Sequence, residues 1–272
     1  SSESGRLGLL YGKGPRLHPG FRKKDMTSGE SPLETGADGA FPATRWSLLL
    51  EDSAHPEKQK EVWESLATSY WKPVYGYVRA RWARTHDDAL DATQEFFLWM
   101  LESGFVRRAN PERGRFRGFV KTALANFLTD LERKKNTLKR GGARALLPIH
   151  GEEDDPVPDL ADTAGRTPEE VLDELWRHEL IERAVSALKD ELEAAGKSRY
   201  FDVFRLYYLD DEKIDHAGTA ARFGIRATDV SNYLDYVKRR YRIQIERAVL
   251  ETVGGRGELE AEVAWLLEGR GR

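Results

Sequence analysis

The sequence predicts an all-α protein built from two helical domains, and three of its features support this fold class. Apolar side chains between residues 41 and 250 recur at spacings of three and four, the period of an amphipathic helix, and no segment alternates with the period of a strand. A stretch of prolines and acidic residues divides this pattern into two parts. The chain of 272 residues is long enough to give each part its own hydrophobic core.

The first 40 residues are expected to be disordered. They contain 8 Gly, 5 Ser and 3 Pro and little apolar periodicity. Such a segment cannot bury enough apolar surface to offset the entropy that is lost on ordering. A first helical domain is expected over residues 41–147, and its first helix is indicated by Trp63, Leu66, Tyr70, Val74, Tyr77 and Val78.

Two further helices are predicted in this domain, over residues 87–102 and, after a turn at residues 110–114, over residues 116–135. The predicted core face of the second helix consists of Leu90, Thr93, Phe97, Met100 and Leu101. The opposite face of that helix carries Asp88, Asp91, Glu95 and Glu102. The predicted core face of the third helix consists of Phe116, Val120, Ala123, Leu124, Phe127 and Leu131.

Residues 148–167 are predicted to be an extended, acidic, proline-containing linker. A helix start follows, because Thr167 can serve as N-cap, Pro168 suits the first helical position and Glu170 can close a capping box. A second helical domain is expected over residues 168–250. The segment 251–272 is expected to form a last amphipathic helix, which could pack on this domain, bind a regulator or cover a DNA-binding surface.

Charge is unevenly distributed, although the formal net charge is only -3. Residues 105–144 contain 12 Lys or Arg and 3 Asp or Glu, whereas residues 151–174 contain 1 and 10. A basic segment with aromatic residues suits nucleic acid, because cations neutralise phosphates and aromatic rings stack on unpaired bases. The alternative is a solvated helix whose aromatic side chains lie in the core. Phe119 lies off the main apolar stripe and is the better candidate for a base contact.

Residues 219–234 have the spacing of a helix-turn-helix. Ala220 is small enough for two helices to cross closely, Gly224 can adopt the positive φ of a tight turn, and Val230 would pack the second helix onto the first. The first residues of the second helix would then face base edges in a major groove. An ordinary helical hairpin would have the same spacing.

Several segments in order along the chain resemble the extracytoplasmic-function (ECF) family of bacterial RNA polymerase sigma factors. Residues 71–78, 88–97, 114–119 and 126–130 resemble the second sigma domain. Residues 200–208 and the helix-turn-helix resemble the fourth sigma domain. The likeness extends over residues 41–250, and its specificity lies in the ordered series of segments.

The resemblance implies that the helix over residues 87–102 binds the largest subunit of the RNA polymerase core. The residues implied in that contact are Asp88, Asp91, Gln94 and Glu95. It also implies that the next helix binds the minus-ten element of promoter DNA and helps to open it. The residues implied there are Arg115, Arg117, Phe119, Lys121, Asn126, Asp130, Arg133 and Lys134.

The resemblance further implies that the helix-turn-helix reads the minus-thirty-five element and that its domain touches the second-largest polymerase subunit. The residues implied in the DNA contact are Arg222, Arg226, Thr228, Ser231, Asn232, Lys238 and Arg239. Asp229 and Asp235 depart from the family pattern and would repel phosphate, so this module should bind weakly by itself. An anti-sigma factor or other regulator is a further candidate partner.

No pattern predicts catalysis, a cofactor or a metal. The chain has no Cys, its six His show no pair at helical spacing, and Gly141-Gly142 lacks the lysine of a phosphate loop. No apolar run approaches the ~20 residues of a membrane helix, so we expect a cytoplasmic protein that is not an enzyme. Two alternatives to a sigma factor are a dimeric helix-turn-helix repressor or activator, and a sigma-like adaptor that binds polymerase or DNA without initiating transcription.

Overall fold

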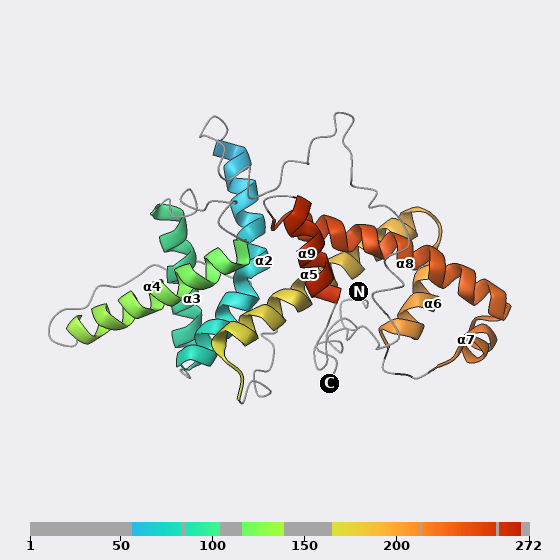
Figure 1. Cartoon of the computed structure of the whole chain (residues 1–272), viewed down its shortest axis with the longest axis horizontal. Helices are drawn as coiled ribbons and strands as arrows, with labels where there is room; N and C mark the ends of the chain where they lie inside the picture. Colours follow the sequence, from blue (N-terminus) through green and yellow to red (C-terminus); the bar gives the residue numbers. More distant parts are fainter. Residues whose placement is uncertain are drawn as a thin grey trace, which may run out of the picture. The chain divides into compact units, whose positions relative to one another are not determined.

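The structure, a computed structural model, describes residues 56–82, 85–103, 116–138, 165–210, 212, 214–253 and 256–267. Within these ranges it contains eight α-helices and no strand, which confirms the predicted all-α class for this part of the chain (Figure 1). The described residues up to Trp176 form one compact unit and those from Arg177 form another. The predictions for residues 1–40, for the turn at 110–114 and for most of the linker lie outside the described residues.

The N-terminal unit consists of α2 (Pro56–Trp82), α3 (His86–Glu102), α4 (Phe116–Leu138) and the first turns of α5 (Pro168–Ala194). Figure 1 shows α2 beside α3, with α4 crossing α3. Large aromatic and aliphatic side chains fill the space between these helices. The largest of them that are fully buried are Trp176, Tyr70, Tyr77, Phe96, Phe116, Leu124, Leu128 and Leu172. Burial of so many large apolar groups is the main source of stability for this unit.

The buried face of α3 differs from the predicted one. Phe96 is fully buried, whereas Phe97 is half-buried and Leu101 is 55% exposed. The residues of α3 that are buried are Ala89, Ala92, Thr93, Phe96 and Met100. These positions follow the helical period, so α3 is rotated about its axis by roughly one residue relative to the prediction. The sequence did not separate the two faces because Phe96 and Phe97 are adjacent aromatics.

The buried face of α4 follows the prediction for Phe116, Val120, Ala123 and Leu124. Leu128 is also fully buried, whereas the predicted core residues Phe127 and Leu131 are only half-buried. Phe127 packs against Phe96 and Trp99, with ring centroids 5.5 Å apart in both pairs. The aromatic rings of α3 and α4 therefore fix the crossing of the two helices.

The capping box predicted at the start of α5 is confirmed. The Thr167 backbone N–H donates to Glu170 Oε2 (3.0 Å), and the Glu170 N–H donates to Thr167 Oγ1 (3.2 Å). The first turns of α5 belong to the N-terminal unit, although the sequence placed the start of the second domain at residue 168. The reason is packing: Trp176 is buried with its ring centroid 6.4 Å from that of Tyr70, and a Cβ at Gly76 would overlap Leu175.

The C-terminal unit consists of the rest of α5, α6 (Ser198–Tyr208), α7 (His216–Phe223), α8 (Ala227–Leu250) and α9 (Arg256–Leu267). Phe204 and Tyr241 lie at its centre, with ring centroids 5.6 Å apart. Burial raises the pKa of the Tyr241 hydroxyl, so this side chain stays neutral in the core.

The last helix packs on the C-terminal unit, which is one of the three roles that the sequence left open for it. α9 contacts α8, and its Leu259 and Leu266 are buried. The Arg177 guanidinium lies 4.2 Å from the centroid of the Trp265 ring and donates to the Trp265 carbonyl (3.2 Å). A cation held over an indole face in this way joins α9 to α5 within the unit.

Candidate functional site

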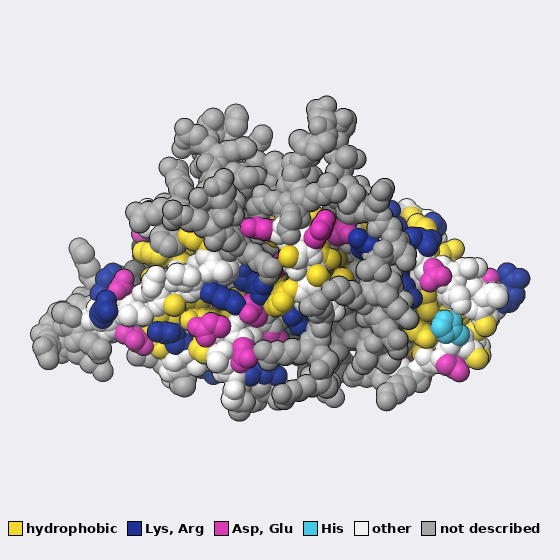
Figure 2. All heavy atoms as spheres, in the orientation of Figure 1, with side chains coloured by type: hydrophobic (Ala, Val, Ile, Leu, Met, Phe, Trp, Pro, Cys, Tyr) yellow, Lys and Arg dark blue, Asp and Glu magenta, His cyan; other side chains and the backbone are white. Residues whose placement is uncertain are grey.

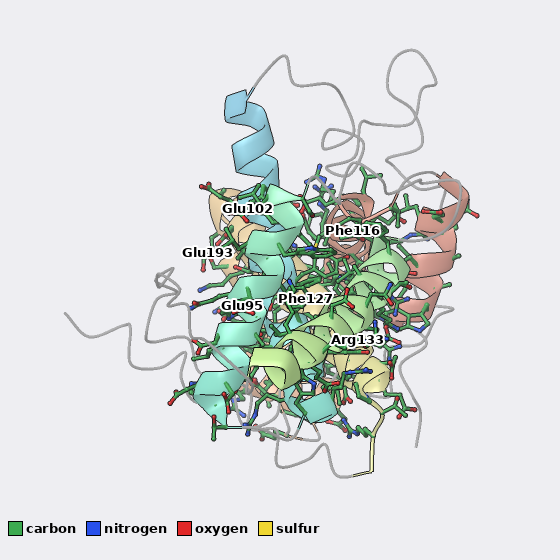
Figure 3. The ribbon with its side chains drawn as sticks, turned by 90° about the vertical axis from the view of Figure 1, so that its left-hand side faces the viewer. Glu95, Glu102, Phe116, Phe127, Arg133 and Glu193 are labelled. Atoms are coloured by element: carbon green, nitrogen blue, oxygen red, sulfur yellow. The ribbon has the colours of Figure 1, made fainter. Side chains whose placement is uncertain are left out.

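The acidic residues of α3 lie on a face that solvent reaches. Asp91 is exposed, and Gln94 and Glu95 are half-buried. Figure 3 shows Glu95 and Glu102 along α3, on the helix that crosses α4. Asp88 has a local role as well, because it accepts a hydrogen bond from the Thr85 hydroxyl (2.9 Å) at the N-cap of α3. The face therefore offers a protein partner carboxylates at spacings of three and four residues.

Half-buried aromatic rings lie beside this acidic face, and the sequence did not predict them as surface. Phe97 stacks on Trp71 (centroids 5.7 Å apart, 22° between planes) and meets Trp63 edge to face (6.4 Å). On α3, Phe97 lies one turn from Gln94 and one turn from Leu101. Partly exposed aromatics next to carboxylates are typical of protein–protein contacts.

The far half of α4 carries four exposed polar residues on one side of the helix. They are Asn126, Asp130, Arg133 and Lys134. Their spacings of four, three and one bring them together on the helix surface. Arg133 lies 3.5 Å from Asp130 and both side chains are largely exposed, so this ion pair adds little stability and leaves the groups accessible. Figure 2 shows Lys and Arg interspersed with Asp and Glu over α4 rather than one uninterrupted basic surface.

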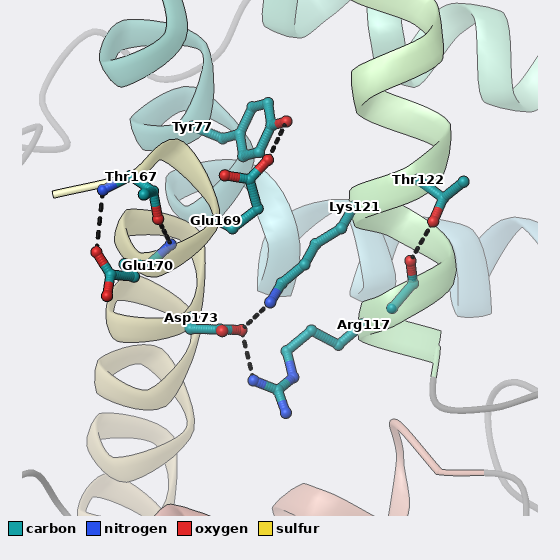
Figure 4. A network of polar contacts seen from close by, with 9 residues as sticks. Tyr77, Arg117, Lys121, Thr122, Thr167, Glu169, Glu170 and Asp173 are labelled. Carbon is teal, nitrogen blue, oxygen red and sulfur yellow. Dashed lines mark hydrogen bonds and ion pairs between the residues drawn. The ribbon is translucent and has the colours of Figure 1, made fainter.

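The first half of α4 is different, because two of the residues implied in the minus-ten contact form ion pairs within the N-terminal unit. Arg117 is buried, its guanidinium donates to Asp173 of α5 (2.5 Å), and it lies 4.9 Å from the centroid of the Trp176 ring. The Lys121 ammonium also pairs with Asp173 (2.6 Å). Figure 4 shows the Asp173 carboxylate between the two cations. Arg117 therefore has a structural role in the packing of α4 on α5, and Lys121 is held beside it by the same carboxylate.

The remaining predicted residues of α4 are placed as follows. Phe119 is half-buried and stacks on Phe116, with centroids 5.9 Å apart and 28° between the planes. It is neither a full core residue nor a freely exposed ring. Arg115 lies outside the described residues.

A further contact joins α2 to the start of α5. The Tyr77 hydroxyl donates to Glu169 (2.9 Å), and burial together with this carboxylate raises the pKa of the tyrosine hydroxyl.

The predicted turn between α7 and α8 is confirmed. Gly224 has φ +62° and ends α7, while the N–H of Ile225 donates to the Ala220 carbonyl (3.0 Å). Ala220 and Val230 are both buried. A left-handed residue followed by a backward hydrogen bond ends a helix sharply, and glycine is the residue that adopts it without strain. The two helices therefore meet through small and branched side chains, as the spacing predicted.

The start of α8 presents polar side chains to solvent. Those that are exposed are Arg226, Thr228, Ser231 and Asn232. Arg222, at the end of α7, is exposed and pairs with Glu212 (2.6 Å). Figure 2 shows Lys and Arg side chains at the end of this unit where α7 meets α8.

The two cations predicted farther along α8 differ in exposure. Arg239 is exposed. Lys238 is half-buried, with its ammonium 5.5 Å from the centroid of the Tyr208 ring and 3.9 Å from Asp235. Tyrosine therefore shields one side of Lys238, whereas Arg239 is the more accessible to a phosphate.

Asp229, which the sequence treated as a source of repulsion, is a capping residue. Its Oδ2 accepts the backbone N–H of Arg226 (3.2 Å), and its two oxygens accept Nε–H and Nη2–H of the same residue (both 3.0 Å). The Arg226 guanidinium lowers the pKa of the Asp229 carboxyl, so the carboxylate stays ionised at neutral pH. This role was readable in principle, since Asp three residues after the N-cap favours a helix start.

Sequence reasoning missed two other contributors. Asp173 and Trp176 lie on the helical stripe that places α5 against α4, but charge counting assigned Asp173 to the acidic linker region. The start of α6 carries an aromatic stack in which Tyr200 lies on Tyr233 (3.8 Å, 19°) and Lys197 lies 4.0 Å from the centroid of the Tyr236 ring. The signal for this stack was the three-residue spacing of Tyr233 and Tyr236 on α8, which brings both rings to the side that faces Tyr200 on α6.

Comparison with protein-family models, curated proteins and solved structures finds no match to this chain. The described helices include none that combines the length and apolar character needed to cross a bilayer. Among the described residues, no three His, Asp or Glu side chains gather in a way that could hold a metal ion.

Proposed function

We propose that this protein is an ECF-type sigma factor that binds the RNA polymerase core and directs promoter recognition, DNA opening and transcription initiation. In this proposal it acts in the cytoplasm and is not an enzyme. The acidic face of α3 binds the largest polymerase subunit, the exposed face of α4 binds the minus-ten element, and α7 with α8 binds the minus-thirty-five element. The two described units correspond to the second and fourth sigma domains.

The observation that carries the proposal is the geometry of α7 and α8. A left-handed glycine joins the two helices, and Ala220 and Val230 bury the contact between them. The first turn of α8 is left exposed and carries hydrogen-bonding side chains rather than apolar ones. That is what a helix needs in order to enter a major groove with its first residues at the base edges.

The faces of α3 and α4 support the polymerase and minus-ten roles. Asp91 and Glu95 offer charge to a basic protein surface, and the neighbouring Phe97 ring adds apolar area to the same contact. Asn126 and Arg133 on α4 can donate hydrogen bonds to bases and phosphates. With Arg117 committed to Asp173, the proposed DNA contact of α4 centres on its exposed second half.

Both DNA-binding faces include carboxylates, which favours a tethered protein over a free DNA-binding regulator. Asp130 lies on the exposed side of α4, and Asp229 and Asp235 lie on α8. Each lowers affinity for a polyanion. Two weak modules on one polymerase act at high effective concentration, so neither needs to bind tightly alone.

The test is a core-binding assay joined to run-off transcription with purified polymerase core. A sigma factor binds core and starts transcripts. Asp91→Lys with Glu95→Lys is expected to abolish core binding without unfolding the protein, because Asp91 is exposed and Glu95 is only half-buried on a face that solvent reaches. Asp190→Lys with Glu193→Lys is the matched control, since it reverses two exposed acids near the end of α5. Wild-type core binding by the α3 variant would show that the docking face is misassigned.

A second variant tests the DNA step separately. Asn126→Ala with Arg133→Ala is expected to retain core binding and to lose promoter opening, because both side chains lie on the exposed side of α4. Permanganate reactivity of unpaired thymines in the promoter measures the opening. A normal bubble would contradict the role given to α4.

The second candidate function is a sigma-like adaptor that binds polymerase or DNA without initiating transcription. One observation favours it: Asp173 neutralises two of the cations predicted for the minus-ten contact. An adaptor would bind core in the same assay and give no run-off transcript. The transcript is therefore the readout that separates the two candidates.

A further inference from the structure

We infer that Arg226 determines specificity for a guanine in the duplex DNA read by α8, and that Asp229 holds the arginine in the orientation which this requires. The inference rests on the proposed function. It specifies which base α8 recognises and which two residues recognise it. Sequence reasoning treated Arg226 as one of several polar candidates and Asp229 as a liability. The geometry of the pair gives them one joint role.

The hydrogen bonds of the pair leave a defined edge of the guanidinium free. Asp229 takes Nε–H and one N–H of Nη2, each at 3.0 Å. Both N–H groups of Nη1 and the second N–H of Nη2 point away from the carboxylate, because the guanidinium is planar. One N–H of Nη1 and the second N–H of Nη2 are parallel and form a two-pronged donor. In a major groove the matching pair of acceptors is O6 and N7 of guanine.

The exposure of the two side chains fits this arrangement. The Arg226 side chain is 83% exposed, whereas that of Asp229 is 24% exposed. The carboxylate thus lies behind the arginine, against the helix, and the arginine faces outward. Thr228, Ser231 and Asn232 are exposed on the same first turns of α8 and can contact neighbouring base pairs.

The pairing also selects a base over a phosphate as the partner of Arg226. A guanidinium bonded to a carboxylate is locally close to neutral, and the carboxylate repels an approaching phosphate. A guanine edge carries no net charge and is bound through directed hydrogen bonds. The acid that weakens attraction to the backbone therefore leaves the base contact available.

Stability of the helix does not account for the pair. The backbone N–H of Arg226 already donates to Asp229, so the N-terminal cap is made without the guanidinium. An exposed ion pair contributes little to folding. Asp229 is accordingly a positioning residue, and Arg226 is the residue that contacts the base.

The experiment selects binding sites from a random-sequence duplex library with the complete holoenzyme, using the full chain and polymerase core. Wild-type protein is expected to enrich sites with guanine at one fixed position of the upstream element. Arg226→Lys keeps the charge and removes the planar fork, so it should lower the preference for guanine at that single position by about 10- to 100-fold. Preferences at other positions should stay unchanged.

Asp229→Asn separates positioning from capping. The asparagine carbonyl can still accept the backbone N–H of Arg226, but its amide nitrogen cannot accept from the guanidinium. Helix content should be unchanged while the guanine preference falls several-fold at the same position. If Asp229 had only a structural role, Asp229→Asn would change the base preference at all positions of the site together or at none of them.

The outcomes distinguish the inference from the proposed function. If Arg226→Lys holoenzyme selects the same guanine as wild type, the inference is overturned and the sigma assignment stands. If Arg226→Lys weakens all positions equally, Arg226 contacts phosphate and the inference is again overturned. If wild-type protein forms no holoenzyme with core, the proposed function fails, and the inference fails with it.

Discussion

Each of the two units contains an arginine bonded to an aspartate, and the two pairs differ in exposure. In the N-terminal unit the Arg117 side chain is 9% exposed and its partner Asp173 is 29% exposed. In the C-terminal unit the Arg226 side chain is 83% exposed and its partner Asp229 is 24% exposed. The chemistry of the ion pair is the same. What differs is which member faces the solvent.

The difference shows that the role of a basic residue on a proposed DNA-binding helix depends on its surroundings and not on its charge alone. Arg117 lies over the Trp176 ring and is enclosed between α4 and α5, so it stabilises the packing of these helices. Arg226 has a carboxylate on one edge only and remains free to bind a ligand on another. A third pair, Arg240 with Glu191, is intermediate, with side chains 34% and 24% exposed. Removal of these pairs should therefore have graded effects.

The largest effect is expected for Arg117→Ala. It removes a buried guanidinium and leaves Trp176 without its covering cation, so the N-terminal unit should lose about 2 to 3 kcal/mol of unfolding free energy. Tryptophan fluorescence during urea unfolding measures this, because six of the seven tryptophans precede residue 177. An unchanged midpoint would mean that the buried pair does not hold α4 to α5.

A double variant serves as the control for this prediction. Arg117→Met with Asp173→Leu replaces the pair by apolar side chains of similar length, and Lys121 can turn to solvent. Because a buried ion pair repays its desolvation poorly, this variant should recover most of the lost stability. Failure to recover it would indicate that the hydrogen-bond geometry of Asp173, rather than packing, stabilises the contact.

The second effect is a dependence of stability on pH at Glu191. Hydrogen bonds from Arg240 and from Gln244 lower the pKa of this carboxyl. A lowered pKa contributes stability above the ordinary value for glutamate, about 4.3, and the contribution is lost as the pH falls through the lowered value. Glu191→Gln should thus cost about 1 to 2 kcal/mol at neutral pH and progressively less in acid.

Thermal unfolding followed by circular dichroism over a series of pH values checks this prediction. The control is Glu193→Gln, an exposed acid on the same helix, whose ion pair with Lys189 is on the surface. Parallel pH curves for wild type and Glu191→Gln would contradict the prediction, because they would show that the titration of Glu191 is not coupled to folding.

The third effect compares a glycine of each unit. Gly224→Ala places a Cβ at φ +62° and should destabilise the C-terminal unit by about 1 to 2 kcal/mol. Gly118 is itself exposed on α4 and has open space at its Cβ, so Gly118→Ala should stabilise the N-terminal unit by up to about 1 kcal/mol. Opposite shifts in the two unfolding transitions are expected. Equal shifts would show that Gly224 is not held in the left-handed conformation.

Sequence reasoning predicted the features that depend on local rules. The all-helical class, the capping box at Thr167 and the left-handed Gly224 each follow from side chains within a few residues, and each is confirmed in the described residues. The exposed polar side of α4 was predictable for the same reason, since helical spacing places Asn126 and Arg133 on one side.

The features that the sequence did not predict are mainly contacts between helices distant in sequence. Arg117 and Asp173 are 56 residues apart, and nothing local indicates that they meet. The choice between Phe96 and Phe97 as the buried residue of α3 depends on the rotation of the helix against α2 and α4, which periodicity leaves open by one residue. Asp229 is a different case, because its capping contact with Arg226 is local and charge counting alone did not indicate it.

The smallest effect on stability is expected for Arg226→Ala, and its contrast with Arg240→Ala completes the graded series. Arg226 is exposed and the backbone cap at Asp229 persists without its guanidinium, so the unfolding midpoint of the C-terminal unit should stay unchanged. Arg240→Ala should lower it, because it removes a partly buried donor to Glu191. Circular dichroism melts of the two variants measure the contrast. If Arg226→Ala destabilised the unit as much as Arg240→Ala, its guanidinium would be part of the fold, and exposure would no longer separate the arginines that stabilise this protein from the one available to bind DNA.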